Sequence, residues 1–268
     1  MEFLAFRIFG PFASWGDVAV GEFRSSLAGP TKSAIVGLVA GALGIRRENH
    51  ELQRLLCEGL GVAVRVDDPG LLVSDYHTIE TPHSKVVDQR AKTGNVPATR
   101  RDELLLGGSN GATKTNISRR EYRMDALAAV ALWSIDGESL PWSLPAIAEA
   151  LRVPQFVPYL GRKACTLGLP LSPTMVMAEH PVAALRAVKF PVDVLLGEQR
   201  GAGSRVEYRW EMVGLSTDAG SPRAQRVELR RDNPRSRTAW LFADRSEQVL
   251  VEHPAEDAKE TDGVSEQN

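Results

Sequence analysis

Short runs of apolar residues, separated by clusters of turn residues, recur along most of the chain. The first run, Phe3–Phe9, is rich in aromatic and branched residues and ends at Gly10 and Pro11, which predicts a β-strand. Strands therefore dominate the expected secondary structure. By the same reasoning, further strands are predicted at Val62–Val66, Leu71–Ile79, Ala128–Trp133, Thr174–Met177, Asp193–Leu196, Arg205–Val213, Gln225–Leu229 and Thr238–Phe242.

Helices are predicted where apolar residues follow a capping residue. The longest apolar run, Ala34–Ile45, comes after Thr31, a suitable N-cap, so that Lys32 and Ser33 lie in the first turn. The order of elements is then β-α-β-β-(β)-α-β, which is typical of a ferredoxin-like or RNA-recognition-motif fold in the α+β class. Two shorter helices complete this order, at Ser143–Leu151 and Pro181–Val188.

The charge of the chain is small in total but unevenly placed. With 268 residues, 43% hydrophobic and a formal net charge of -2, the chain is expected to form one or two globular domains, not a coat on nucleic acid. Residues 85–123 hold nine basic and four acidic residues, a net +5, whereas residues 252–268 hold one basic and six acidic residues, a net -5. The tail has too few apolar residues to fold and is predicted to be disordered. We expect a body over residues 1–190 with a basic insertion at about 85–117, a small β-rich region over 191–251 and the acidic tail from 252.

Patterns for catalysis, metal binding and membrane insertion are weak. Cys57 and Cys165 cannot make a disulfide framework or a four-ligand zinc site, and so few cysteines fit a reducing cytoplasm. The longest apolar run has about 12 residues, too few to span a bilayer. We expect no secretory signal. Gly107–Thr115 lacks the spacing of a phosphate-binding loop, and Ser14 lacks a nucleophile elbow. We therefore expect no catalytic residue, cofactor or metal ligand.

Anion-binding features are stronger, and there are three of them. One is the helix N-terminus with Lys32 and Ser33, where backbone N–H groups, an ammonium and a hydroxyl meet. Each feature alone is more often an ordinary surface, but three without a catalytic set favour RNA or DNA binding. The other two combine cations with an aromatic residue and consist of Tyr159, Gly161, Arg162 and Lys163, and of Arg119, Arg120, Tyr122 and Arg123.

An ordered set of motifs resembles one family. The stretches are Gly10–Gly16 with Arg24 and Pro30–Ile45, then Asp75–Thr78, then Arg120–Asp125 with Val130–Trp133, then Pro158–Cys165. Together they resemble the CasD family, the subunits of type I-E CRISPR Cascade complexes that bind the 5′ handle of CRISPR RNA (crRNA). The resemblance covers roughly residues 3 to 178 and is thin beyond them, where it is limited to Arg231, Asp232, Pro234, Arg237 and Trp240. Three features depart from the family: Lys32 for the usual arginine, Ala34 for the usual glycine, and the acidic tail.

The resemblance implies a cytoplasmic, non-catalytic RNA-binding subunit. Its body would be RNA-recognition-motif-like, and the insertion at 85–117 would be a thumb that presses into the guide and helps to kink it. Lys32 and Ser33 would take handle phosphates, and Arg24 a phosphate or base edge. The 159–163 segment would cradle the handle, and the cluster at 119–123 would contact RNA at the thumb base. Expected partners are the crRNA 5′ handle, a Cascade backbone subunit and the large subunit, with target DNA met only through the complex and no membrane.

Two alternatives stay open. Relatives in another CRISPR subtype cut repeat RNA without a metal, and Tyr76, His77 and Lys85 could supply a general acid and base for such an endoribonuclease. A generic protein-interaction module is the other alternative, and it would not co-purify with RNA.

Overall fold

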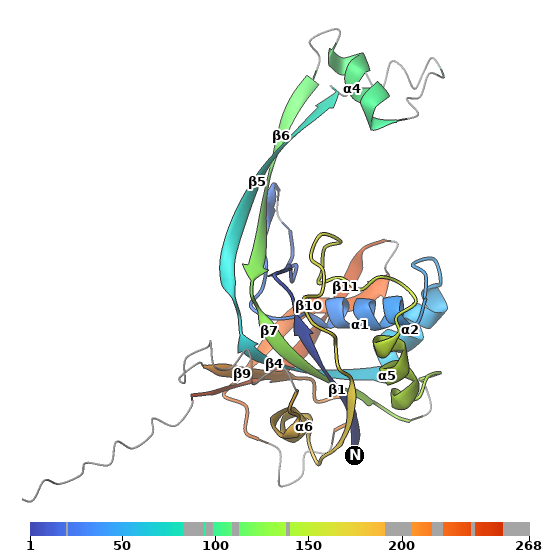
Figure 1. Cartoon of the computed structure of the whole chain (residues 1–268), viewed down its shortest axis with the longest axis vertical. Coiled ribbons are helices and arrows are strands. Elements are labelled where there is room, and N and C mark those ends of the chain that lie inside the picture. Colours follow the sequence, from blue (N-terminus) through green and yellow to red (C-terminus); the bar gives the residue numbers. More distant parts are fainter. Residues whose placement is uncertain are drawn as a thin grey trace, which may run out of the picture.

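A long two-stranded arm projects from a mixed α/β body in the computed structural model (Figure 1). The structure describes residues 1–19, 21–82, 94, 99–108, 113–137, 140–190, 205–215, 222–236 and 239–253. Every helix in these ranges is too short or too polar to cross a bilayer.

A seven-stranded antiparallel sheet forms the body, in the order β10-β11-β9-β4-β7-β1-β8. Its central strands are apolar on both faces because helices cover one face and a second core cluster covers the other. The strands are β1 (Glu2–Phe9), β4 (Leu60–Asp68), β7 (Leu127–Ser134), β8 (Thr174–Met177), β9 (Val206–Trp210), β10 (Arg226–Ser236) and β11 (Leu241–Glu252).

Three helices pack on one face of this sheet: α1 (Lys32–Ala42), α2 (His50–Gly59) and α5 (Leu144–Arg152). The other face carries α6 (Pro181–Ala187) (Figure 1). The predicted cap at Thr31 is confirmed, since its hydroxyl accepts from the N–H of Ala34 at 3.2 Å. Ser143 caps α5 as predicted, accepting from Ala146 N at 3.3 Å. The helix α2 was not predicted from the sequence; Asn49 caps it by accepting from Leu52 N.

The C-terminal strands belong to the sheet of the body, which corrects the expected boundary at residue 191. β9 pairs antiparallel with β4, with Ala63 opposite Trp210, and β11 and β10 then extend the sheet outward. The two cores on either side of the sheet therefore draw on residues from both ends of the chain. The strand predicted at Asp193–Leu196 lies outside the described residues.

The arm is built from a second sheet that starts earlier than the insertion expected at 85–117. β5 (Leu71–Pro82) and β6 (Thr113–Met124) pair along their full length, from Leu71 opposite Met124 to Pro82 opposite Thr113. The helix α4 (Arg100–Gly108) lies at the far end of the arm (Figure 1). Within 85–117, the structure describes only residues 94, 99–108 and 113–117.

At its base the arm is tied to the body by two short strands. β2 (Phe12–Ala13) pairs antiparallel with the end of β6, and β3 (Phe23–Arg24) pairs parallel with its middle. The expected start of the tail at residue 252 is one residue early, because Glu252 closes β11. Residues 254–268, where we predicted disorder, lie outside the described part of the chain.

Candidate nucleic-acid interface

A groove of about 1120 Å³ crosses the surface beside α1. It is bounded by the loop after β2, the turn between α1 and α2, the loop at 156–162, and the facing ends of β10 and β11. Elements from both ends of the chain therefore meet at one concave surface, which the body sheet and the arm base hold in place.

Cations and aromatic rings gather in this groove. Guanidinium groups suit phosphates, and exposed rings suit unpaired bases, which is the combination found in proteins that bind single-stranded nucleic acid. Of the residues predicted from the sequence, the groove contains Arg24, Ser33, Tyr159, Gly161 and Arg162. Its other cations and rings are Arg46, Arg47, Arg231, Phe156, Trp240 and Phe242, and its acidic members are Asp17, Glu48 and Asp232.

The loop at 156–162 is held against the start of the chain by its own backbone. Ser14 N donates to Leu160 O at 3.0 Å, and Leu160 N donates to Cys165 O at 2.7 Å. Leu160 and Cys165 are buried, and burial raises the pKa of the Cys165 thiol. The loop therefore presents Tyr159, which is 43% exposed, from a firmly anchored base.

Gly161 allows two backbone segments of this chain to approach each other closely. Its φ is +84°, and a Cβ built at this position would lie 1.8 Å from the carbonyl oxygen of Ser14. Only glycine fits, because a side chain would overlap the backbone and the left-handed conformation is strained for other residues. The glycine thus allows close approach of the chain's own backbone, and it places Tyr159 and Arg162 beside the groove.

Arg162 links the same loop to the arm. Its Nη1 donates to Glu121 O at 2.9 Å, and its guanidinium lies 4.5 Å from the centre of the Tyr122 ring. Arg123 also holds the arm base, donating to the carbonyl oxygens of Leu27 at 3.0 Å and Ser26 at 3.2 Å. Part of the predicted 119–123 cluster is therefore structural.

The remaining predicted cations do not line the groove. Arg119 is exposed and Arg120 is half-buried on β6, and Lys163 is exposed next to Arg162.

Lys32 does not occupy the position that the sequence suggested. It is only 4% exposed, and its Nζ lies 3.1 Å from both carboxylate oxygens of Glu211. Its backbone N–H donates to Asp232 Oδ2 at 2.8 Å. The ammonium and the positive end of the helix are both met by carboxylates of the same chain, so neither is offered to a phosphate. Ser33 remains at the groove, with its hydroxyl 3.0 Å from that of Thr31.

The two carboxylates belong to a buried charge network on β10 and β11. Arg245 donates to Asp232 at 2.6 and 2.9 Å and to Glu247 at 2.7 Å. Burial alone would lower the pKa of Arg245, but its hydrogen bonds to Asp232 and the negative charges of Glu247, Asp232 and Glu211 raise it. The network fastens the C-terminal strands to the start of α1, so it shapes one wall of the groove.

We expect Lys32→Met to lower the free energy of unfolding by about 2 to 3 kcal/mol, because it removes the cation that is hydrogen-bonded to the buried Glu211 carboxylate. Arg245, whose Nη1 lies 3.7 Å from Glu211 Oε1, is then the nearest cation. Urea denaturation measures the change in stability. For Lys32→Met, the salt dependence of RNA binding is expected to match that of the unaltered chain. Lys163→Met is the control, and it is expected to leave stability unchanged because Lys163 is exposed. Normal stability combined with a reduced salt dependence for Lys32→Met would restore the original assignment.

Tyr76 and His77, two of the three residues of the endoribonuclease alternative, do not converge. Tyr76 and His77 are successive residues of β5, so their side chains project from opposite faces of the arm. His77 Nε2 lies 2.5 Å from Asp75 Oδ2, and Lys85 is outside the described residues. Within the described ranges, no group of three or more His, Cys, Asp or Glu side chains is arranged to hold a metal ion.

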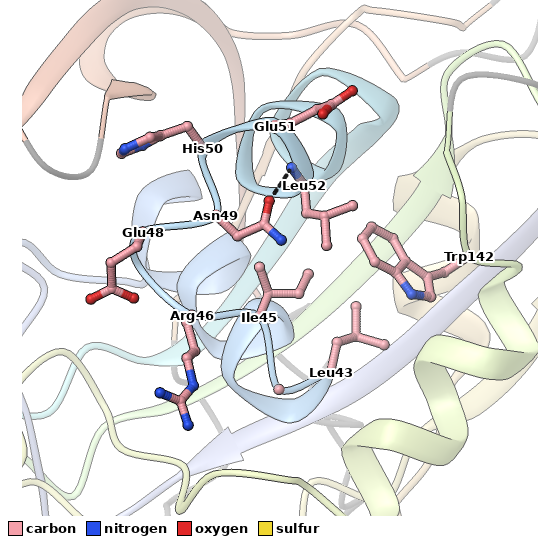
Figure 2. A pocket seen from close by; sticks show the side chains of 10 residues that line it. Leu43, Ile45, Arg46, Glu48, Asn49, His50, Glu51, Leu52 and Trp142 are labelled. Atoms are coloured by element: carbon pink, nitrogen blue, oxygen red, sulfur yellow. Dashed lines mark hydrogen bonds between the residues drawn. The ribbon is translucent and has the colours of Figure 1, made fainter.

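A second depression, of about 850 Å³, lies between the α1–α2 turn and Trp142 (Figure 2). Figure 2 shows Leu43 and Leu52 beside the Trp142 ring, whereas Arg46 and Glu48 point away from it. The depression therefore has an apolar floor without a convergent set of polar groups. Arg46 lines both this depression and the groove beside α1.

The sequence signal for the missed groove residues was weak. Arg46 and Arg47 follow directly after the apolar run that predicts α1. Two cations at this position are typical of the C-terminal end of any helix, so they did not indicate a binding site. Trp240 and Phe242 stand about 200 positions further on, within a segment of alternating charge. Only the pairing of β9 with β4 brings these distant segments to the same surface.

Comparison with known proteins gives one consistent family. The family model described as CRISPR-associated protein (Cas_Cas5) matches residues 3–246. The chain is 30% identical over 189 residues to the CRISPR system Cascade subunit CasD of Escherichia coli (strain K12), covering 69% of this chain and 75% of that protein. A solved structure titled "CRISPR RNA-guided surveillance complex" contains a chain with a TM-score of 0.52 and 25% identity, covering 95% of this chain and 91% of its own. Another, titled "Crystal structure of Cas protein", matches in fold with a TM-score of 0.51 and 24% identity over 94% of each chain.

Proposed function

Since the chain belongs to the Cas5 family of CRISPR-associated proteins, we propose that it is the RNA-binding subunit of a type I-E Cascade surveillance complex. It binds the 5′ handle of crRNA, caps one end of the complex backbone and catalyses no reaction. The family and the Cascade relative support the role in a surveillance complex, and the handle is our more specific assignment.

The groove is the observation that carries this proposal. It combines five arginines, four aromatic rings and the Ser33 hydroxyl on one concave surface of a chain whose net charge is -2. Bulk attraction to RNA is therefore weak, and binding depends on where the cations stand. Such a surface favours one defined stretch of single-stranded RNA, as expected for a handle, over RNA of any sequence or length.

The arrangement of the body supports an RNA-recognition-motif-like fold. Its central strands neighbour one another in the order β4-β7-β1-β8, and the chain runs β1-α1-α2-β4-β7-α5-β8 apart from the arm. With α1 and α5 on one face, this is the β-α-β-β-α-β arrangement of ferredoxin-like folds, to which α2, α6 and the strands β9, β10 and β11 are added. In our proposal the added strands supply one wall of the RNA site.

The arm is proposed to act as the thumb. It projects beyond the body, so it can reach a neighbouring backbone subunit and press into the guide beside the handle (Figure 1). The large subunit would meet another part of the surface, and target DNA would be met only through the complex. We place the assembled complex in the cytoplasm.

Co-expression with the other Cascade subunits and a repeat-spacer array tests the proposed function. The tagged chain is expected to pull down partner subunits together with RNAs that share one 5′ end. Recovery of partner chains without RNA would favour the protein-interaction alternative. Cleavage of labelled repeat RNA by the purified chain in the absence of metal, abolished by His77→Ala, would favour the endoribonuclease.

A further inference from the structure

Trp240 stands out among the residues of the groove. It is 61% exposed, although a tryptophan ring is the largest apolar surface that a side chain can place in water. It precedes β11 and lines the groove together with Leu241 and Phe242. Because most of the ring is exposed, packing in a core does not explain why a tryptophan stands at this position.

The backbone at Trp240 is strained as well. Its φ is +51°, in the left-handed region that a bulky side chain rarely adopts. Backbone strain of this kind persists when surrounding structure or function maintains it. Here the residue is exposed, so burial of the ring does not account for the strain.

A cation and a second aromatic ring accompany the indole. The Arg47 guanidinium lies 4.4 Å from the centre of the Trp240 ring, and the Phe242 ring is 6.4 Å away with its plane inclined by 38°. Arg46 and Arg231 line the same groove. The indole is thus contacted by a cation on one side and keeps most of its surface open, in a groove that contains further arginines.

We propose that Trp240 stacks against one unpaired nucleobase of the bound RNA, and that Arg47 positions the indole and faces the adjacent phosphate. This site rests on the proposed function, because it requires RNA in the groove. The chemistry favours a nucleobase over an apolar protein segment, since a flat ring beside a guanidinium group complements a base and its phosphate together. A protein contact at this surface is one outcome that the experiment can reveal.

The test uses the purified full chain and a short single-stranded RNA with the sequence of the crRNA 5′ handle, in which 2-aminopurine replaces one base. Trp240→Leu is expected to lower the affinity by roughly 5- to 100-fold, the effect of losing one stacked base. Trp240→Phe retains most of the affinity, because it keeps a stacking ring. The slope of binding against salt stays the same for Trp240→Leu, since no phosphate contact is removed. The 2-aminopurine is then moved along the RNA. At one position, we expect the unaltered chain and Trp240→Phe to quench its fluorescence, and Trp240→Leu not to quench it.

Trp142→Leu provides the matched control, because Trp142 lines the other depression and not the groove. It is expected to bind RNA like the unaltered chain, and urea denaturation verifies that each variant is folded. Failure of the unaltered chain to bind this handle RNA would count against the proposed function itself. Equal affinity and equal quenching for Trp240→Leu would overturn only the stacking site. Loss of assembly with a protein subunit at unchanged RNA affinity would identify Trp240 as a protein contact instead.

Discussion

Simultaneous replacement of Arg24, Arg46 and Arg231 by glutamate lowers the affinity for single-stranded RNA by at least about 100-fold. Each guanidinium lines the groove, and a hydrogen bond to a charged group contributes about 1.5 to 3 kcal/mol. The slope of log affinity against log salt becomes shallower by about 2, because up to three phosphate contacts are lost. Fluorescence anisotropy over a salt series measures both quantities.

This triple replacement is expected to leave the fold intact. The side chains of Arg46 and Arg231 are exposed and make no hydrogen bond or ion pair to the described residues, and Arg24 donates only to the nearby carbonyl oxygens of Gly21 and Phe23. The matched control replaces Arg54, Arg152 and Lys189 by glutamate, which changes the net charge equally at exposed sites outside the groove. An equal loss of affinity in the control would mean that total charge, and not the groove, governs binding.

Gly161→Ala is expected to destabilise the chain by about 2 to 5 kcal/mol. The added Cβ meets the Ser14 carbonyl oxygen at 1.8 Å, and alanine is also strained at a φ of +84°. Because the loop at 156–162 must move away from Ser14, Tyr159 and Arg162 lose their positions and RNA affinity falls with stability. Thermal denaturation and RNA binding are measured on the same preparation.

Gly16→Ala is the control for this change. Gly16 also lines the groove, but a Cβ there meets no atom within 4 Å, and its φ is not in the left-handed region. Near-normal stability and RNA binding are expected. A Gly161→Ala chain as stable as the Gly16→Ala chain would show that the loop does not depend on this close approach.

Local sequence signals predicted the elements well where the deciding interactions are themselves local. Thr31 and Ser143 cap helices through the N–H three residues on, and the apolar run of β7 needs no distant partner to be identified as a buried strand. The strand β5 was also predicted, but not that it leaves the body to pair with β6. Strand pairing depends on residues more than thirty positions away, which a local pattern does not encode.

The candidate site was harder to predict because burial and ion pairing are long-range properties. Lys32 looks like a phosphate ligand beside Ser33, yet its partner Glu211 is 179 positions away and lies next to β9. Gly161 was grouped with Tyr159 and Arg162 from the sequence, but the close approach of the Ser14 backbone, which requires a glycine at this position, is evident only in the structure. Trp240 enters the groove only because β11 is added to the body sheet through β9.

The most direct test of the account is to cross-link the assembled complex through its guide RNA. Photoreactive 4-thiouridine is placed along the 5′ handle, and the cross-linked peptides of this chain are mapped by mass spectrometry. The account predicts cross-links in the groove, at residues 46–47, 156–162 and 240–242. Cross-links confined to the opposite side of the body, such as α6 or the exposed Val227 and Leu229 of β10, would contradict it.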